Sequence, residues 1–323
     1  MISLLDFTPS ATMADYHIPV LRDPVLTLLQ PGPGKRFVDG TLGGGGHSEA
    51  LLETGAEVIG IDQDPEALGF AARRLSRFGT RFRPAAGNFA DAGAILPAFG
   101  AGKFDGVLLD LGVSSWQLDT PERGFSFLHE GPLDMRLAGA GGPTAADLVN
   151  RLPVEALARL FAELGDEPRA RAIARAIGRA REQAPLVTTR QLAELVARVA
   201  PRPGRATHPA TRVFLALRLA VNDELSVLDR GLVAAWRALR PGGRLAVITF
   251  HGGEVRVVRR FLRERERPYE LPPGQADVPE LRRPCPPRLR RVSRRPVTPG
   301  ADELAANPRA RSAQLWLMEK LAD

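Results

Sequence analysis

The pattern of hydrophobic and polar positions between residues 35 and 111 alternates between short apolar runs and stretches with helical spacing. The apolar runs predict four strands, at residues 35–39, 57–62, 81–86 and 104–111. Helices are predicted at residues 46–54 and 64–79, the second with Asp64 as its N-cap and Pro65 at its first position. The nearly continuous apolar character of the last run is typical of a buried parallel strand. This order predicts a doubly wound α/β sheet.

A different pattern follows the fourth predicted strand. Apolar residues recur every three or four positions in residues 157–164, 192–199 and 214–232, which predicts amphipathic helices. Strands are predicted again at residues 244–250 and 311–320. A helical insertion within an α/β domain explains this order. We expect an extension at residues 1–15, the sheet domain at 16–137 and 213–323, and the insertion at 138–212.

Composition narrows the classes of protein and site. The chain has 323 residues, 44% hydrophobic and 25% charged, as in ordinary globular proteins. No run approaches the roughly 18 apolar residues of a membrane span, and the first dozen residues lack the basic start of a signal peptide. The single cysteine, Cys285, excludes an internal disulfide and a multi-thiolate metal site. We expect a cytoplasmic protein without a metal.

Positive charge is concentrated in the second half of the chain. Residues 1–150 hold 11 basic and 18 acidic side chains, a net charge of −7, whereas residues 151–323 hold 33 and 19, a net charge of +14. Of the 44 basic residues only three are lysines, and the guanidinium fork of arginine matches phosphate oxygens. A GC-rich genome would explain the preference for arginine but not its uneven distribution. The second half therefore favours a phosphate-rich partner.

Two groups of arginines are candidates for phosphate contacts. One forms a stripe with helical spacing, which could equally be a solvated face, and the other lies in a Pro/Arg-rich arm at residues 281–300. The prolines of the arm exclude a regular helix, so we expect an extended segment. The candidates are Arg171, Arg175, Arg179, Arg212, Arg288, Arg290 and Arg291.

A glycine-rich turn at residues 40–46 follows the first predicted strand, where open α/β sheets bind their ligands. A phosphate-binding P-loop needs a lysine after its second glycine, and this turn has none. The dinucleotide pattern G-x-G-x-x-G fits only if Leu42, Ser48 or Glu49 takes a small-residue position, which disfavours a nicotinamide cofactor. S-adenosylmethionine carries no phosphate and is suited to carboxylates at strand ends.

Carboxylates of this kind end three predicted strands. They are Asp39, Asp62 and Asp110, with Asp62 placed to accept both ribose hydroxyls and Phe89 placed to pack on adenine. Each also has a structural interpretation: Asp39 could brace the turn, Asp62 could cap a helix, and Phe89 could belong to the core. Their joint order along the chain favours an S-adenosylmethionine site.

The turn at residues 111–115 is expected to face the methyl acceptor. Asp110 ends a buried strand, where an acid without a partner costs free energy, so we expect it to have a catalytic role. Ser114 and Ser115 are candidates for shaping the acceptor pocket, or alternatively for capping a helix. His251 follows the fifth strand at the same sheet edge and could line the pocket or only satisfy a loop.

Several motifs closely resemble those of a bacterial family, the ribosomal RNA small subunit methyltransferases H, which act on a cytosine N4 of 16S rRNA. They lie at residues 16–21, 38–48, 109–119, 122–127, 131–136, 208–212 and 307–312. The resemblance implies a class I methyltransferase fold with a helical recognition insertion. It also implies cofactor contacts at Gly45, Gly46, His47, Asp62, Phe89, Asp110 and Gln117, to which the strand-end argument adds Asp39 and Gly43.

The resemblance further implies 16S rRNA or the 30S subunit as partner, with a cytidine of the decoding centre as target and a homodimer left open. The family usually has His-Ser-Leu-Glu-Asp-Arg after the fifth strand, whereas residues 251–256 read HGGEVR, so Val255 replaces the second acid. Leu42 also replaces a usual phenylalanine. Two alternatives stay open. One is an assembly factor that has lost catalysis, and the other is a DNA amino-methyltransferase, although the Pro-Pro-aromatic motif of that class is missing after Asp110.

Overall fold

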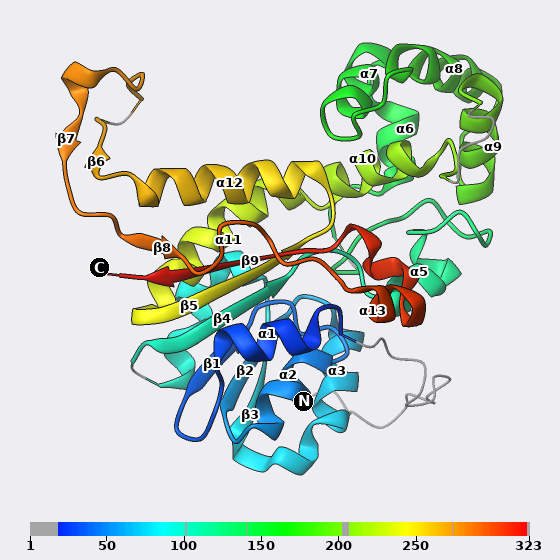
Figure 1. The fold of residues 1–323 in the computed structure, drawn as a ribbon. Helices are drawn as coiled ribbons and strands as arrows, with labels where there is room; N and C mark the ends of the chain where they lie inside the picture. Colours follow the sequence, from blue (N-terminus) through cyan, green and yellow to red (C-terminus); the bar gives the residue numbers. More distant parts are fainter. Residues whose placement is uncertain (1–18, 101, 140, 202–206, 273, 322–323) are drawn as a thin grey trace.

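The computed structural model describes residues 19–321 apart from residues 101, 140, 202–206 and 273. A seven-stranded sheet in the order β3-β2-β1-β4-β5-β9-β8 forms its centre (Figure 1). The predicted extension at residues 1–15 lies outside the described residues. The strands are β1 (Arg36–Asp39), β2 (Glu57–Asp62), β3 (Phe82–Ala86), β4 (Phe104–Asp110), β5 (Leu239–Thr249), β8 (Leu289–Arg291) and β9 (Gln314–Lys320).

Strands β1 to β5 are parallel, while β9 and β8 are antiparallel to their neighbours. Val38 of β1 lies opposite Ile59 of β2 and Val107 of β4, which sets the register at the centre of the sheet. The prediction of a doubly wound α/β sheet is confirmed. The strand order reverses between β1 and β4, and open sheets of this kind bind ligands at that position.

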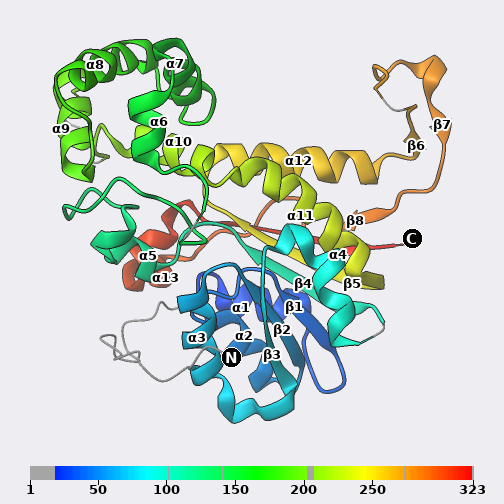
Figure 2. The ribbon, with the colours of Figure 1, turned by 180° about the vertical axis from the view of Figure 1, so that it is seen from behind.

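Helices cover both faces of the sheet because alternate residues of each buried strand point to opposite sides. Val38 and Val107 belong to one core with Leu232, whereas the preceding Phe37 belongs to the other core with Leu51. The two faces are covered by different helices (Figures 1 and 2). One face carries α1 (Arg22–Leu29), α2 (Gly46–Glu53) and α3 (Pro65–Arg74), and the other carries α4 (Ala92–Ile95), α11 (Glu224–Ala238) and α12 (Gly252–Glu266).

Between β4 and β5 the chain forms a helical lobe that rises from one end of the sheet (Figure 1). Its helices are α6 (Ala145–Arg151), α7 (Val154–Glu163), α8 (Ala170–Gln183), α9 (Thr189–Val199) and α10 (Thr211–Val221). Leu157, Ile173 and Leu192 are fully buried in a separate hydrophobic core. That core also takes in Phe125 and Leu217, so it extends on both sides of the predicted 138–212 insertion.

The apolar pattern at residues 214–232 does not form one helix. The chain turns between α10 and α11, where Asp223 has a φ of 49°, in the left-handed region. Asn222 fixes this break: its Oδ1 accepts from Leu137 N at 2.8 Å, and its Nδ2 donates to Met135 O at 2.8 Å. The break depends on residues far away in the sequence, so helical spacing on either side does not report it.

The Pro/Arg-rich arm is partly built into the sheet. Residues 289–291 form β8, which pairs with β9, while β6 (Tyr269–Glu270) and β7 (Arg283–Pro284) make a projecting hairpin at the far end of α12 from the helical lobe (Figures 1 and 2). Within the described residues, no helix is both long enough and apolar enough to span a membrane.

Candidate functional site

A cavity of about 740 Å³ opens at the carboxyl ends of β1, β2 and β4 and continues to α10. Its volume falls in the range of small-molecule sites. Seven predicted cofactor contacts line it, namely Gly43, Gly46, His47, Asp62, Phe89, Asp110 and Gln117, and so do Ser114, Ser115 and His251. Asp39 and Gly45 lie outside the lining, so those two predicted contacts stand behind the wall.

The glycine turn after β1 brings backbone close to neighbouring elements. A Cβ on Gly40 would lie 2.6 Å from Leu109 Cδ2, so no larger residue fits there without rearrangement. Gly45 has a φ of 78°, and a Cβ there would lie 3.0 Å from Leu75 Cδ1. Gly45 therefore serves the packing of α2, whereas Gly43, with its amide bonded to Asp62, belongs to the cavity wall.

Asp39 acts as a brace inside the turn. It is 1% exposed, its Oδ2 accepts from Ser48 Oγ at 2.7 Å, and its Oδ1 accepts from Thr41 N at 3.2 Å. Burial raises the pKa of Asp39 from its usual value, and the Ser48 hydroxyl opposes that shift. Both oxygens are used to hold the turn and the start of α2, as the structural interpretation of the sequence expected.

Asp62 joins the ends of two elements and faces the cavity. Its Oδ2 accepts from Gly43 N at 2.7 Å and its Oδ1 from Asp64 N at 2.9 Å. Burial raises the pKa of Asp62 to about 6, although both backbone bonds lower it. Each carboxylate oxygen can accept more than one hydrogen bond. Asp62 can therefore still accept hydroxyl donors from a ligand.

His47 and Asp110 form the least satisfied polar group of the cavity wall. His47 Nε2 lies 3.5 Å from Asp110 Oδ2, and Asp110 N donates to Thr41 Oγ1 at 2.7 Å. Among the described residues, neither ring nitrogen of His47 nor Asp110 Oδ1 has a hydrogen-bond partner, although all three atoms are buried. Buried polar atoms are normally hydrogen-bonded. His47 and Asp110 therefore leave three buried polar atoms unpaired in residues that line the cavity.

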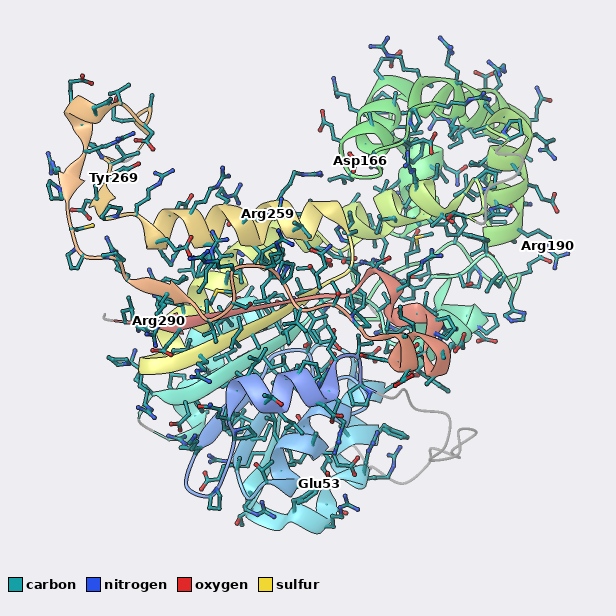
Figure 3. All side chains as sticks on the ribbon, viewed as in Figure 1. Glu53, Asp166, Arg190, Arg259, Tyr269 and Arg290 are labelled. Carbon is teal, nitrogen blue, oxygen red and sulfur yellow. The ribbon has the colours of Figure 1, made fainter. Side chains whose placement is uncertain are left out.

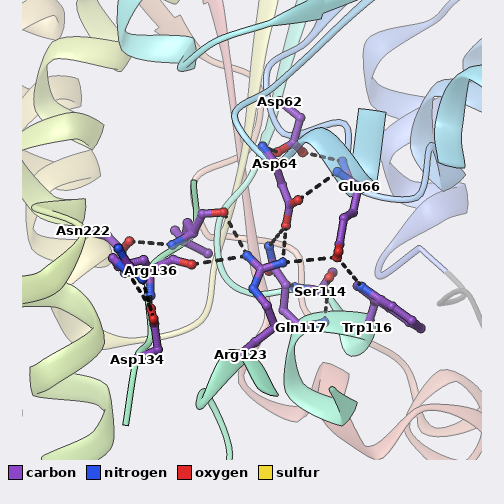
Figure 4. A network of polar contacts seen from close by, with 12 residues as sticks. Asp62, Asp64, Glu66, Ser114, Trp116, Gln117, Arg123, Asp134, Arg136 and Asn222 are labelled. Carbon is purple, nitrogen blue, oxygen red and sulfur yellow. Dashed lines mark hydrogen bonds and ion pairs between the residues drawn. The ribbon is translucent and has the colours of Figure 1, made fainter. Parts of the chain in front are cut away.

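The wall is held to α3 by a polar network that the sequence patterns did not reveal (Figure 4). Ser114 caps α5 (Ser115–Asp119) in a reciprocal pair with Gln117, as the capping interpretation expected. Gln117 Nε2 donates to Asp64 Oδ2 at 3.1 Å, and Arg123 Nη1 donates to the same oxygen at 2.8 Å. Arg123 Nη2 also donates to Leu137 O at 2.9 Å. Gln117 therefore positions the wall as well as lining it.

His251 begins α12 at the opposite side of the cavity. Its Nδ1 accepts from Gly253 N at 3.2 Å, and Glu254 Oε2 accepts from Phe250 N at 2.6 Å. His251 Nε2 lies 3.2 Å from Glu254 Oε1, but without hydrogen-bond geometry. Val255 packs against the hydrophobic core instead and does not line the cavity. The side chain that stands in place of the family's second acid therefore lies outside the cavity wall.

The helical lobe supplies an aromatic wall that the sequence reasoning did not identify. The Phe127 ring lies 4.6 Å from His208 and 4.9 Å from Phe214, measured between ring centroids. Arg218 and Glu224, which also line the cavity, are joined by two bonds of 2.8 and 2.9 Å. The motifs at residues 122–127 and 208–212 contain Phe127 and His208, but the sequence did not show that these rings meet. Planar rings here suit a planar heteroaromatic ligand.

The predicted phosphate contacts do not form one surface. Arg171, Arg175 and Arg179 are exposed on α8, at the end of the helical lobe far from the sheet (Figure 1). Arg212 donates to Asp166 O at 2.6 Å. In the arm, Arg290 lies on the edge strand β8 (Figure 3).

Each arginine predicted in the arm already has an acidic partner that lies distant in the sequence. Arg288 pairs with Glu270 at 3.1 Å, Arg290 with Glu319 at 2.8 Å, and Arg291 with Glu266 at 2.5 Å. Over the ranges that the structure describes, no cluster of three or more His, Cys, Asp or Glu residues is arranged to hold a metal ion.

Comparison with known proteins gives a consistent result. The MraW methylase family matches residues 14–321. A protein of Carboxydothermus hydrogenoformans named ribosomal RNA small subunit methyltransferase H is 47% identical over 95% of this chain and 98% of its own length. Proteins of the same name from Syntrophotalea carbinolica and Thermomicrobium roseum are 49% and 48% identical. A solved putative rRNA-methylase from Clostridium thermocellum has a TM-score of 0.41 at 13% identity, covering 93% of this chain and 95% of its own.

Proposed function

The chain belongs to the MraW methylase family, and from this premise we propose that it methylates the N4 amine of a cytidine in the decoding centre of 16S rRNA. Family membership makes it an S-adenosylmethionine-dependent methyltransferase with the class I fold. The relatives are named for small-subunit ribosomal RNA, which supports an rRNA substrate and action in the cytoplasm. The observation that carries the proposal is the buried His47–Asp110 pair with unpartnered polar atoms in the cavity wall.

The lining residues fit S-adenosylmethionine. Asp62 would accept the ribose hydroxyls, Phe89 would pack on the adenine, and the backbone of the glycine turn would lie along the ligand. His47 and Asp110 provide the polar atoms that need a partner. When bound, S-adenosylmethionine supplies a methyl group on a sulfonium, which is already a good leaving group. The chain therefore has to bind, orient and deprotonate the acceptor.

Asp110 is the proposed proton acceptor. The lone pair of a cytosine amine is delocalised into the ring, so the amine is a weak nucleophile. A carboxylate that hydrogen-bonds to the amine protons favours the pyramidal, nucleophilic nitrogen and takes the departing proton. Ser114 and Ser115 would shape the space around the base, with Phe127 and Phe214 against its ring. Positioning of the nitrogen and the methyl group would then supply most of the rate.

The proposed substrate must bring its cytosine out of the helical stack, as enzymes that act on bases require. We assign the flanking RNA to the arginines of α8, to Arg212 and to the arm. Arg288 would exchange Glu270 for a phosphate at low cost, because both side chains are about half exposed and exposed ion pairs contribute about 0–1 kcal/mol. The salt dependence of rRNA binding measures how many such contacts form.

The catalytically inactive alternative rests on the replacement of an acid by Val255. Val255 packs against the hydrophobic core and does not line the cavity, so this replacement leaves the cavity wall unchanged. The names of the relatives direct attention to rRNA and not to DNA.

The test uses labelled S-adenosylmethionine and 30S subunits from cells that lack the native methylation. After the reaction, the rRNA is digested to nucleosides, and we expect label in N4-methylcytidine. Label in a different nucleoside would contradict the proposed target atom. Cofactor binding without any labelled nucleoside would contradict the proposed activity. Subunits that already carry the methyl group are the matched control and should take up no label.

A further inference from the structure

Leu128 is an apolar side chain left in solvent at the entrance of the cavity. It is 74% exposed, the highest value among the large hydrophobic residues in the described part of the chain, and it lines the cavity. Val187, Val278 and Leu321 are 52%, 38% and 42% exposed, but none of them lines the cavity. A single exposed leucine needs no explanation in general. Leu128 differs from the other three in its location, because it lies where the proposed acceptor enters the cavity.

The segment that carries Leu128 is closely packed on both sides. A Cβ on Gly124 would lie 2.1 Å from Pro132 O, and one on Gly131 would lie 1.8 Å from Pro121 O. Thr189 Oγ1 accepts from Gly131 N at 3.1 Å and donates to His129 O at 3.1 Å. These contacts fasten the segment to the start of α9. Leu128 is therefore an exposed apolar side chain on a loop whose backbone is held in place by hydrogen bonds.

The residue before Leu128 points into the cavity wall. Phe127 packs its ring against His208 and Phe214, and all three line the cavity. Consecutive residues thus place one apolar side chain beside the proposed base and the next one in solvent at the entrance. The hydrogen bond from Leu128 N to Ser126 Oγ, 3.2 Å long, closes the turn between them.

A base that enters the cavity leaves a gap in the RNA stack, and unstacking costs a few kcal/mol. Nucleic-acid-binding proteins are known to insert apolar side chains such as leucine between base steps. We propose that Leu128 enters the RNA stack and occupies the place of the target cytosine while Phe127 contacts the extruded base. The inference rests on the proposed function, since it assumes an RNA base as acceptor.

The experiment compares Leu128→Ala, Leu128→Met and Leu128→Lys with the wild-type enzyme. Val187→Ala is the matched control, an exposed aliphatic residue outside the cavity. Single-turnover methylation is measured with saturating S-adenosylmethionine on unmethylated 30S subunits and on a short single-stranded RNA with the same cytidine. We expect Leu128→Ala to slow methylation of 30S subunits about tenfold or more and to react normally with the single strand, where unstacking is cheap.

Leu128→Met keeps an apolar wedge and should retain most of the rate on 30S subunits, while Val187→Ala should be unchanged. Leu128→Lys adds a positive charge, so it should bind 30S subunits at least as tightly as wild type but methylate them slowly. Cofactor affinity should be equal in all variants, because the proposed role concerns only the RNA.

Three results would contradict the proposal that Leu128 enters the RNA stack. The first two are normal methylation of 30S subunits by Leu128→Ala or by Leu128→Lys. The third is equal slowing of Leu128→Ala on 30S subunits and on the single-stranded RNA. The last result would place Leu128 in the base pocket instead. If the wild-type enzyme methylates neither RNA, the proposed function fails, which is a different outcome from failure of the wedge alone.

Discussion

The ends of β1 and β4 present the same residue type on neighbouring parallel strands but surround it differently. At the end of β1, the oxygens of Asp39 accept hydrogen bonds from Thr41 in its own turn and from Ser48 in the first turn of α2. At the end of β4, Asp110 lines the cavity, and its Oδ1 is buried without a partner among the described residues. The comparison separates an acid that holds the scaffold together from an acid that is ready for a ligand. Asp62 combines both situations, because it accepts two backbone hydrogen bonds and also lines the cavity.

The largest effect should come from Asp110→Asn. The amide has the same size but cannot take the proton of the acceptor amine, and general-base catalysis is typically worth about 10²–10⁴-fold. We expect the single-turnover rate on 30S subunits to fall at least about 100-fold, with little change in the free energy of unfolding. Rapid-quench kinetics and thermal unfolding measure the two quantities. A nearly normal rate with unchanged cofactor affinity would remove Asp110 from this role.

Asp39→Ala should show the opposite behaviour. It leaves the Ser48 hydroxyl and the Thr41 amide without their partner in a buried turn, which should lower the free energy of unfolding by about 2–3 kcal/mol. Ser48→Ala removes only one of these bonds and should cost about 1 kcal/mol. Denaturant unfolding measures both losses, and the rate of the folded fraction should fall less than in Asp110→Asn. Equal free energies of unfolding for wild type and Asp39→Ala would show that the hydrogen bonds of Asp39 do not stabilise the fold.

Asp62 should give the smallest effect, a pH dependence of cofactor binding. Burial raises the pKa of Asp62 to about 6, so ribose hydroxyls meet a carboxylate at pH 7 and a protonated acid at pH 5. Affinity for S-adenosylmethionine should therefore fall by up to about tenfold per pH unit below the pKa. Titration calorimetry between pH 5 and 8 measures it, and Asp62→Asn should flatten the profile. If the affinity of the wild-type protein did not change between pH 5 and 8, Asp62 would not be the acceptor of the ribose hydroxyls.

The same pKa fixes the sign of the stability effect in the cofactor-free protein. Because the folded pKa of about 6 lies above the ordinary value of 3.8, protonation of Asp62 favours the folded state. The stabilisation of the folded state by protonated Asp62 is complete below pH 3.8 and is lost as the pH rises through about 6.

The sequence predicted those features that depend on neighbours along the chain. The parallel strands follow from their apolar runs, and Asp64 caps α3 ahead of Pro65 as expected. The three acids at strand ends follow from the same runs, because parallel strands bring their carboxyl ends to one edge. Local pattern also offered both interpretations of Asp39 and Ser114 without choosing between them.

Features that depend on distant residues were not predictable in this way. Phe89 packs on α11 where a Cβ on Gly231 would lie 2.1 Å from its ring, a contact that no spacing rule reports. Likewise, Arg291 meets Glu266 only because β8 returns beside α12. The helical lobe separates the first pair along the chain and the β6–β7 hairpin separates the second, so no local pattern reports either contact.

Asn222 has a mechanical consequence. Its side chain joins Leu137 and Met135, where the chain enters the helical lobe, to the point where the chain leaves it. One amide therefore clasps the two ends of an excursion of 85 residues. These two bonds link the entry of the lobe directly to the residue that precedes Asp223, the N-cap of α11. Without the Asn222 side chain, the junction between lobe and sheet would depend on the remaining contacts, among them the bond from Arg123 to Leu137 O and the paired bonds between Arg218 and Glu224.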